Sequence, residues 1–188
     1  MFIQTQDTPN ANTMAFFPGR IILEKGTRDF KQAADCQHAP LARRVLGIEG
    51  VAGVMYGFDF ISVTKAEDQD WAYLKPLVLS GMVDHFLAGL PVLEGSEADS
   101  AEEASTDDSS IVKEIKHLLD TRVRPSVAQD GGDILFDRFD AETGVLFLHL
   151  RGACSGCPSS SMTLKSGIEN MMRYYIPEVL EVRAASDL

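Results

Sequence analysis

Two cysteines that stand three residues apart, Cys154 and Cys157, are the side chains of this 188-residue chain whose type and spacing point most directly to chemistry. In a tight turn this spacing lets both sulfur atoms face one point, as chelation of a single metal centre requires. Pro158 suits the first position of a helix and would place Cys157 near the N-cap, where the helix dipole favours a thiolate over a thiol. The neighbouring residues are small, which would let a bulky inorganic group or the backbone of a partner approach closely: Ala153, Ser155 and Gly156.

Several chemistries use a pair of cysteines at this spacing. A purely structural pair would be an odd way to fill a core at a polar helix entry. A structural zinc site takes four protein ligands, so zinc would require a second chain. Thiol-disulfide exchange is a stronger alternative, because thioredoxin-type motifs also lie between a strand and a helix. An iron-sulfur cluster needs about four thiolates, and two chains that share one cluster across a symmetric interface would supply them.

The other candidate residues are better explained by structural roles. Gly131-Gly132 lacks the Gly-Lys-Ser/Thr continuation of a phosphate loop, so the pair predicts a sharp turn before a strand. Cys36 has no cysteine nearby in sequence and is predicted to be a lone thiol, and His149 lies on a strand whose alternation does not place it beside the sulfurs. The serines at 159–161 fit the first turn of a helix, and no serine, histidine and acid recur at a hydrolytic spacing. We therefore expect no catalytic reaction.

Apolar periodicity predicts the elements that hold the two cysteines. In chain order they are a helix, two strands, a helix and a short strand, over residues 111–123, 134–139, 145–150, 164–175 and 179–182. Ser109 or Ser110 is the expected N-cap of the first helix, and Pro125 is its expected end. The result is an α-β-β-α-β order with the cysteines between the second strand and the second helix.

The first half of the chain also mixes strands and helices. Its expected elements are strands over residues 20–23 and 58–64, a helical stretch over 30–46 and a helix over 74–90. Pro40 divides the helical stretch. The later helix has an apolar residue at every fourth position and stops near Pro91.

Between the halves, residues 94–110 read EGSEADSAEEASTDDSS and carry seven acidic residues and no basic one. Such a segment is typical of a flexible, self-repelling linker. Residues 1–93 and 111–188 each carry a net charge of −2, so the linker supplies −7 of the total of −11. The sequence therefore predicts an α/β (α+β) protein with two small mixed domains, 1–93 and 111–188, joined by a flexible acidic linker, 94–110.

Composition argues against several classes of protein. A net charge of −11 and a pI near 4.7 disfavour binding to nucleic acid or to acidic membrane surfaces. The longest apolar run is the length of a strand, far below the roughly 18 residues of a membrane helix. Three cysteines at these positions do not form a disulfide framework, and Arg20, the first basic residue, comes too late for a secretory or mitochondrial leader. We therefore expect a cytoplasmic protein.

Three motifs of the C-terminal half stand in a familiar order and spacing: Arg124-Pro125, Asp130-Gly-Gly-Asp133 and Gly152-Ala-Cys154-Ser-Gly-Cys157-Pro158. In these motifs the half resembles the NifU C-terminal domain of the Nfu family. The N-terminal half is similar to the Nfu N-terminal domain in four motifs: Phe2-Ile-Gln, Thr8-Pro-Asn10, GFDFISVTK over residues 57–65, and Lys75-Pro76. The resemblance covers the chain apart from the linker.

This resemblance implies a carrier or scaffold for an iron-sulfur cluster. Its cofactor would be a 4Fe-4S cluster that bridges two protomers through Cys154 and Cys157 of each, so that the cluster holds a homodimer together. The implied partners are upstream cluster assembly proteins as donors and apo iron-sulfur proteins as recipients.

Overall fold

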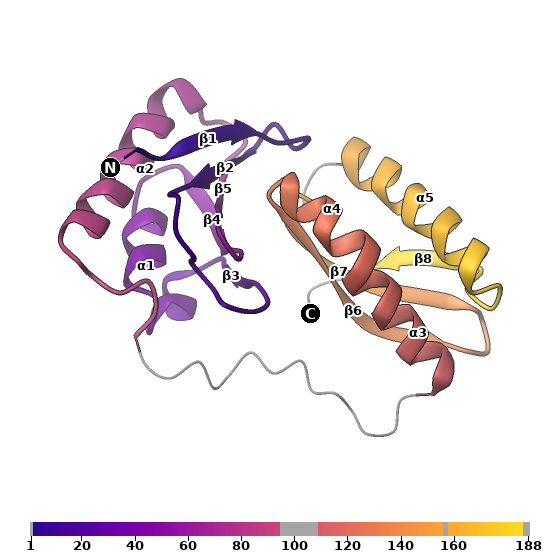
Figure 1. The fold of residues 1–188 in the computed structure, drawn as a ribbon. Helices are drawn as coiled ribbons and strands as arrows, with labels where there is room; N and C mark the ends of the chain where they lie inside the picture. Colours follow the sequence, from indigo (N-terminus) through magenta and orange to yellow (C-terminus); the bar gives the residue numbers. More distant parts are fainter. Residues whose placement is uncertain (1, 95–108, 156–157, 186–188) are drawn as a thin grey trace. The chain divides into compact units, whose positions relative to one another are not determined.

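The computed structural model describes residues 2–94, 109–155 and 158–185, and the side chains of residues 158–161 are outside that description. The chain divides into two compact units, Met1–Ser100 and Ala101–Leu188 (Figure 1). Both units combine helices with a sheet, which confirms the mixed α+β fold expected from the sequence. The predicted linker lies largely outside the described residues.

The first unit is built on an antiparallel five-stranded sheet with the strand order β1-β2-β5-β4-β3. In chain order the strands are β1 (Gln4–Asp7), β2 (Thr13–Phe17), β3 (Arg28–Phe30), β4 (Val51–Tyr56) and β5 (Ile61–Lys65). The predicted strand over 58–64 corresponds to β5. The predicted strand over 20–23 is wrong, because these residues form an irregular loop in which the N–H groups of Ile22 and Leu23 donate to the Phe58 carbonyl.

Two helices pack beside this sheet. α1 (Pro40–Leu46) contacts β4 and follows the 3-10 turn Ala33–Cys36, so Pro40 begins a helix where the sequence placed a division. α2 (Trp71–Leu87) confirms the predicted later helix and is N-capped by Asp70, whose carboxylate accepts from the Ala72 N–H at 2.9 Å. The described core of this unit is apolar and includes residues of α1, α2 and four strands.

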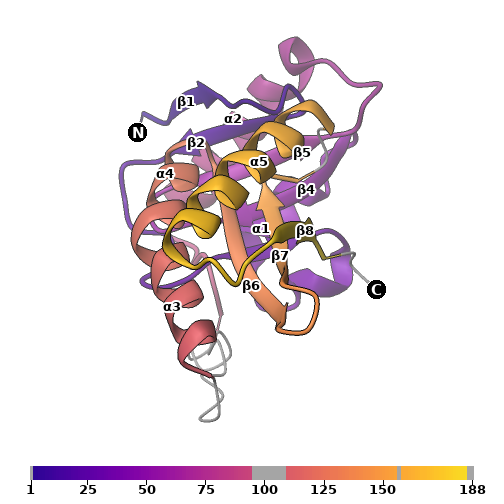
Figure 2. The same cartoon turned by 90° about the vertical axis from the view of Figure 1, so that its right-hand side faces the viewer.

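The second unit has a three-stranded sheet in the order β6-β7-β8 (Figure 2). Its elements are α3 (Ser110–Leu118), a π-helical turn (Leu119–Val123), α4 (Arg124–Gln129), β6 (Gly132–Asp140), β7 (Val145–Gly152), α5 (Pro158–Tyr175) and β8 (Glu181–Ala184). β6 and β7 are antiparallel, whereas β7 and β8 are parallel. The α3–α4 segment and α5 lie on the same face of this sheet in both views. The predicted α-β-β-α-β order is confirmed.

One boundary in this unit was predicted wrongly. Pro125 does not end the first helix, which is N-capped by Ser109 as expected but continues to Gln129. Proline lacks an N–H and its ring presses on the preceding turn. Here that turn is widened, because the Arg124 N–H donates to the carbonyl of Leu119, five residues back. The π-helical turn thus lets the chain pass a proline without losing its helical course.

The second unit has a core of its own. Its buried residues come from α3, the π-helical turn, α4, α5 and all three strands, and none of them belongs to the core of the first unit. No helix in the described part of the chain is both long and apolar enough to span a membrane.

Candidate metal centre

The cysteine motif lies between the end of β7 at Gly152 and the start of α5 at Pro158, as the sequence predicted. Gly152 has a positive φ of 57°, which turns the chain sharply out of the strand. The turn is held by the Ser155 N–H and the Ser155 hydroxyl, which both donate to the Gly152 carbonyl, at 3.1 and 2.9 Å. Cys154 therefore occupies a defined position at the tip of β7. Cys157 lies outside the described residues.

Cys154 packs inward against the start of β6. Its residue is only 7% exposed, and a Cβ atom at Gly132 would collide with its Sγ and come within 3.0 Å of its backbone nitrogen. Burial, reinforced by the negative charges of Asp133 and Asp130, raises the pKa of the Cys154 thiol to about 12. In this state Cys154 is a protonated thiol at neutral pH. The expectation of a thiolate concerned Cys157 at the start of the helix.

The Gly131-Gly132 pair forms the predicted turn. Gly131 has a φ of 73° and links α4 to β6, and its carbonyl accepts from the Ala153 N–H at 3.1 Å. Gly132 pairs with Gly152 in the sheet register. The two glycines therefore bring the backbone of the turn directly against the cysteine loop, where a side chain at position 132 would not fit.

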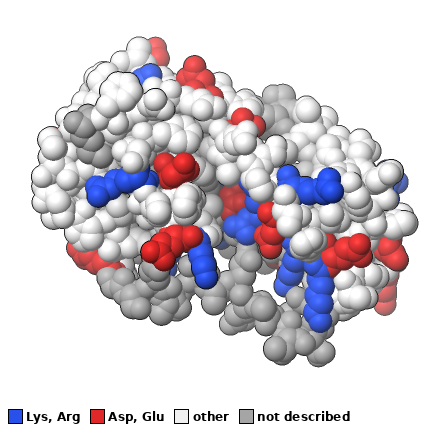
Figure 3. All heavy atoms as spheres, viewed as in Figure 1, with Lys and Arg blue, Asp and Glu red and all other residues white. Residues whose placement is uncertain are grey.

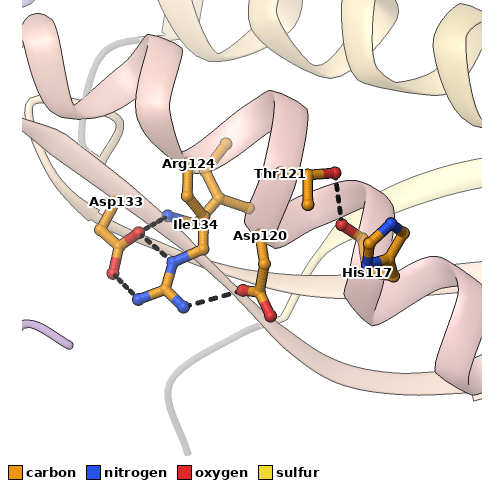
Figure 4. Close-up of polar contacts among 6 residues, drawn as sticks. All are labelled: His117, Asp120, Thr121, Arg124, Asp133 and Ile134. Atoms are coloured by element: carbon orange, nitrogen blue, oxygen red, sulfur yellow. Dashed lines mark hydrogen bonds and ion pairs between the residues drawn. The ribbon is translucent and has the colours of Figure 1, made fainter. Parts of the chain in front are cut away.

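An ion pair between a buried aspartate and a partly exposed arginine lies immediately beside this turn (Figure 4). The Arg124 guanidinium donates from Nε and Nη2 to the two carboxylate oxygens of Asp133, at 2.9 and 3.1 Å, and from Nη1 to Asp120 at 2.9 Å. The Asp133 side chain is 4% exposed. Sequence reasoning gave neither residue a role in the site. The available signal was an acidic residue placed between a turn and a buried strand, a position where a charge needs a partner.

The other candidate residues have the structural surroundings that were expected. Cys36 is fully buried in the first unit, where its Sγ contacts the Gln32 carbonyl at 3.6 Å and burial raises its pKa. His149 is hydrogen-bonded to Asp137, with Nε2 at 3.1 Å from Oδ1. Among the described residues, which leave out Cys157, no group of three or more His, Cys, Asp and Glu side chains could hold a metal.

Charged side chains of both signs are interspersed on the face of the molecule in Figure 3. Both signs also occur beside the cysteine loop, where Asp133 is paired with Arg124.

Comparison with known proteins matches both halves of the chain to families. Residues 3–89 match the model described as "Scaffold protein Nfu/NifU N terminal", and residues 115–183 match that of the "NifU-like domain". The human protein named "NFU1 iron-sulfur cluster scaffold homolog, mitochondrial" is 49% identical over the whole chain, which covers 73% of that protein. "NifU-like protein 5, mitochondrial" of Arabidopsis thaliana is 48% identical, with all of this chain and 69% of that protein covered. A solution structure of a NifU-like protein from Saccharomyces cerevisiae matches 51% of this chain and 87% of its own, with 23% identity and a TM-score of 0.46.

These names contradict the predicted cytoplasmic location, because the relatives at 47–49% identity are named as mitochondrial proteins. The prediction rested on cysteine usage and on the late first basic residue. Free thiols indicate a reducing environment, which does not by itself identify the cytoplasm. The matches to both family models and the identity to these relatives show that the chain belongs to the Nfu family of NifU-like proteins.

Proposed function

We propose that this protein is an iron-sulfur cluster carrier that holds its cargo through Cys154 and Cys157 and performs no catalytic reaction of its own. The observation that carries the proposal is the position of the cysteine motif, on the loop between β7 and α5 within the matched NifU-like domain. Relatives of the chain are named as iron-sulfur cluster scaffolds, which supports the same role here.

The number of thiols favours a cluster shared between two chains. A 4Fe-4S cluster is usually held by four cysteine thiolates. Each chain has three cysteines, and one of them, Cys36, is fully buried in the core of the first unit. Two chains related by a twofold axis would offer two Cys154 and two Cys157 side chains to one cluster. We propose such a cluster-bridged homodimer, held chiefly by the cluster itself so that the cargo can be released.

The surroundings of Cys154 favour cluster binding over thiol-disulfide exchange. Reactive cysteines in exchange enzymes have a lowered pKa. Burial and two nearby aspartates give Cys154 the opposite shift. A coordinated metal deprotonates a thiol outright, so a raised pKa in the metal-free protein is compatible with ligation and couples loading to proton release.

Delivery requires contacts beyond the cluster site. We propose that residues 1–93 form a domain that docks an apo iron-sulfur protein, that 111–188 form the cluster-binding domain, and that 94–110 tether the two. Upstream cluster assembly proteins would act as donors. Shortening the acidic segment to a few residues should slow transfer to a recipient without changing the cluster content, and equal transfer rates would contradict this division of labour.

The proposal is tested by anaerobic reconstitution, with iron, acid-labile sulfide and solution mass measured together. About two irons and two sulfides per chain in a dimer are expected for a shared cubane. Cys154→Ser and Cys157→Ser should each abolish loading, whereas Cys36→Ser is the matched control that should retain it. A colourless monomer that keeps both thiols and turns over a disulfide substrate would instead support exchange, and stoichiometric zinc in place of iron would support a zinc-bridged module.

A further inference from the structure

The Arg124–Asp133 pair uses nearly all the hydrogen-bonding capacity of a buried carboxylate. Oδ1 of Asp133 accepts from Arg124 Nε and from the Ile134 N–H, both at 2.9 Å, and Oδ2 accepts from Arg124 Nη2 at 3.1 Å (Figure 4). A bidentate contact of this kind fixes direction as well as distance, because the guanidinium is a rigid planar fork. The pair therefore joins the first residue of α4 to the beginning of β6 in one geometry.

The pair contributes more to geometry than to net stability. Removing two charges from water costs about as much as their attraction returns, so replacing a buried ion pair by apolar side chains is often neutral. The place of this pair beside a candidate ligand suggests a role in geometry. Asp133 directly follows Gly132, the residue against which the Cys154 side chain packs.

Chain continuity and two contacts connect the pair to the cysteine loop. Asp133 follows the Gly131-Gly132 turn, the Gly131 carbonyl accepts from the Ala153 N–H at 3.1 Å, and Gly132 pairs with Gly152 across the sheet. The absence of a Cβ at Gly132 leaves room for the Cys154 Sγ. Any shift of the start of β6 would consequently move the surface on which Cys154 rests.

We propose that Arg124 and Asp133 are positioning residues for Cys154, which lock the turn between α4 and β6 and thereby hold the thiol where it can ligate the cluster. The inference rests on the proposed function for the identity of the cargo. It adds a role for two residues that do not touch the cluster. Residues that orient a ligand in this way typically change metal affinity by about 10- to 100-fold when they are altered.

Arg124→Lys tests the proposal, because it keeps the charge and removes the fork. Cluster retention is measured as the half-life of the loaded protein in a ferrous-iron chelator. A displaced Cys154 thiol is detected in the apo-protein by a change in its rate of alkylation. The rate is resolved by mass spectrometry and is referenced to that of Cys36 in the other unit. Arg173→Lys is the matched control, since Arg173 contacts Glu169 at 3.5 Å on the exposed side of α5. If Arg124→Lys does not fold, Asp133→Asn replaces it, as it keeps an acceptor for the Ile134 N–H and leaves Arg124 its contact with Asp120.

A second control separates positioning from a general loss of stability. Leu146→Ala removes a fully buried side chain at the far end of β7, where Leu146 pairs with Phe139. Arg124→Lys and Leu146→Ala are each held at the temperature that gives them the same unfolded fraction. The alkylation rate of Cys154 is then compared as its ratio to the rate of Cys36 in the same sample. We expect Arg124→Lys to lose its cluster about 10- to 100-fold faster than Leu146→Ala, with faster labelling of Cys154 and with Arg173→Lys unchanged.

Equal labelling and equal cluster retention in Arg124→Lys and Leu146→Ala would overturn the positioning role. A wild-type protein that takes up no cluster would refute the proposed function instead. The labelling comparison would then still decide whether the ion pair holds Cys154.

Discussion

The two units have separate cores, and a single core truncation can therefore test whether each unfolds by itself. Leu146 lies on β7 in the core of the second unit and is fully buried. The chain has one tryptophan, Trp71, which belongs to the first unit. Leu146→Ala should thus weaken a unit that contains no tryptophan.

The size of the effect follows from the burial of Leu146. Truncation of a fully buried leucine to alanine removes its transfer free energy and leaves a cavity, at a cost of about 2–5 kcal/mol. For a unit of this size, each kcal/mol lowers the thermal midpoint by roughly 4–8 °C. A loss of about 3 kcal/mol should therefore lower the midpoint of the second unit by roughly 12–24 °C.

Two optical signals distinguish the units. The Trp71 indole N–H donates to the Ala11 carbonyl at 3.1 Å and its ring lies 6.4 Å from that of Phe16, so tryptophan fluorescence reports unfolding of the first unit. Far-ultraviolet circular dichroism reports both. In Leu146→Ala the dichroism should show an early transition while the fluorescence midpoint stays in place. Val78→Ala, a truncation at a fully buried position of α2, is the reciprocal control that should move the fluorescence midpoint.

The reasoning fails if Leu146→Ala lowers the fluorescence midpoint as much as the dichroism midpoint. The two units would then unfold as one cooperative body, in spite of cores that share no residue.

Three further predictions concern local stability. Burial lowers the pKa of His85 below its ordinary value of 6.5, so the His85 imidazole binds a proton more tightly in the unfolded chain than in the folded one. The first unit should therefore lose stability as the pH falls below about 6.5. His85→Gln should reduce this pH dependence in urea titrations at pH 5 and 7. Asp70→Ala removes the N-cap of α2 and should cost about 1 kcal/mol, read from the fluorescence midpoint, whereas an unchanged midpoint would mean that water replaces the cap. Gly167→Ala adds a methyl group to α5 in open space and should raise the free energy of unfolding of the second unit by about 0.5–1 kcal/mol, measured by urea titration. A decrease would show strain that the open surroundings do not suggest.

The second unit was more predictable from sequence than the first. Its strands are long and its helices have clear apolar periodicity, so every element was expected. The largest differences in bounds are the first helix, which runs past Pro125, and α5, which begins at Pro158 and not at residue 164. In the first unit, β1 is polar and largely exposed, β3 has three residues, and β4 was hidden in a glycine-rich stretch. Short strands of this kind are specified by their neighbours in the sheet, and those neighbours are distant in sequence.

The sequence shows the candidate cysteine motif directly, and the ligand role of its cysteines stays a prediction, whereas the support of Cys154 was not predicted. The spacing of Cys154 and Cys157 is a local property and was read directly. The Arg124–Asp133 contact spans a turn between a helix and a strand, and it depends on the helix continuing past Pro125. Because the sequence analysis ended the helix at Pro125, it did not place Arg124 at the start of a further helical segment, α4. The π-helical turn that prevents the stop has no signature that sequence periodicity detects.

The parallel pairing of β7 with β8 has a consequence for how the protein folds. β6 and β7 are joined by a four-residue turn and can pair early, whereas β8 must wait for residues 153–180 to cross over. Closing the longer connection costs more chain entropy, so β8 is expected to dock last. Cys154, near the start of this crossover, belongs to the same buried core as Val182 of β8, so its full burial is expected only when that core is complete. Newly made or refolding chains would therefore pass through an interval in which the Cys154 thiol is open to oxidation, and reductant should matter more for this thiol during folding than after it.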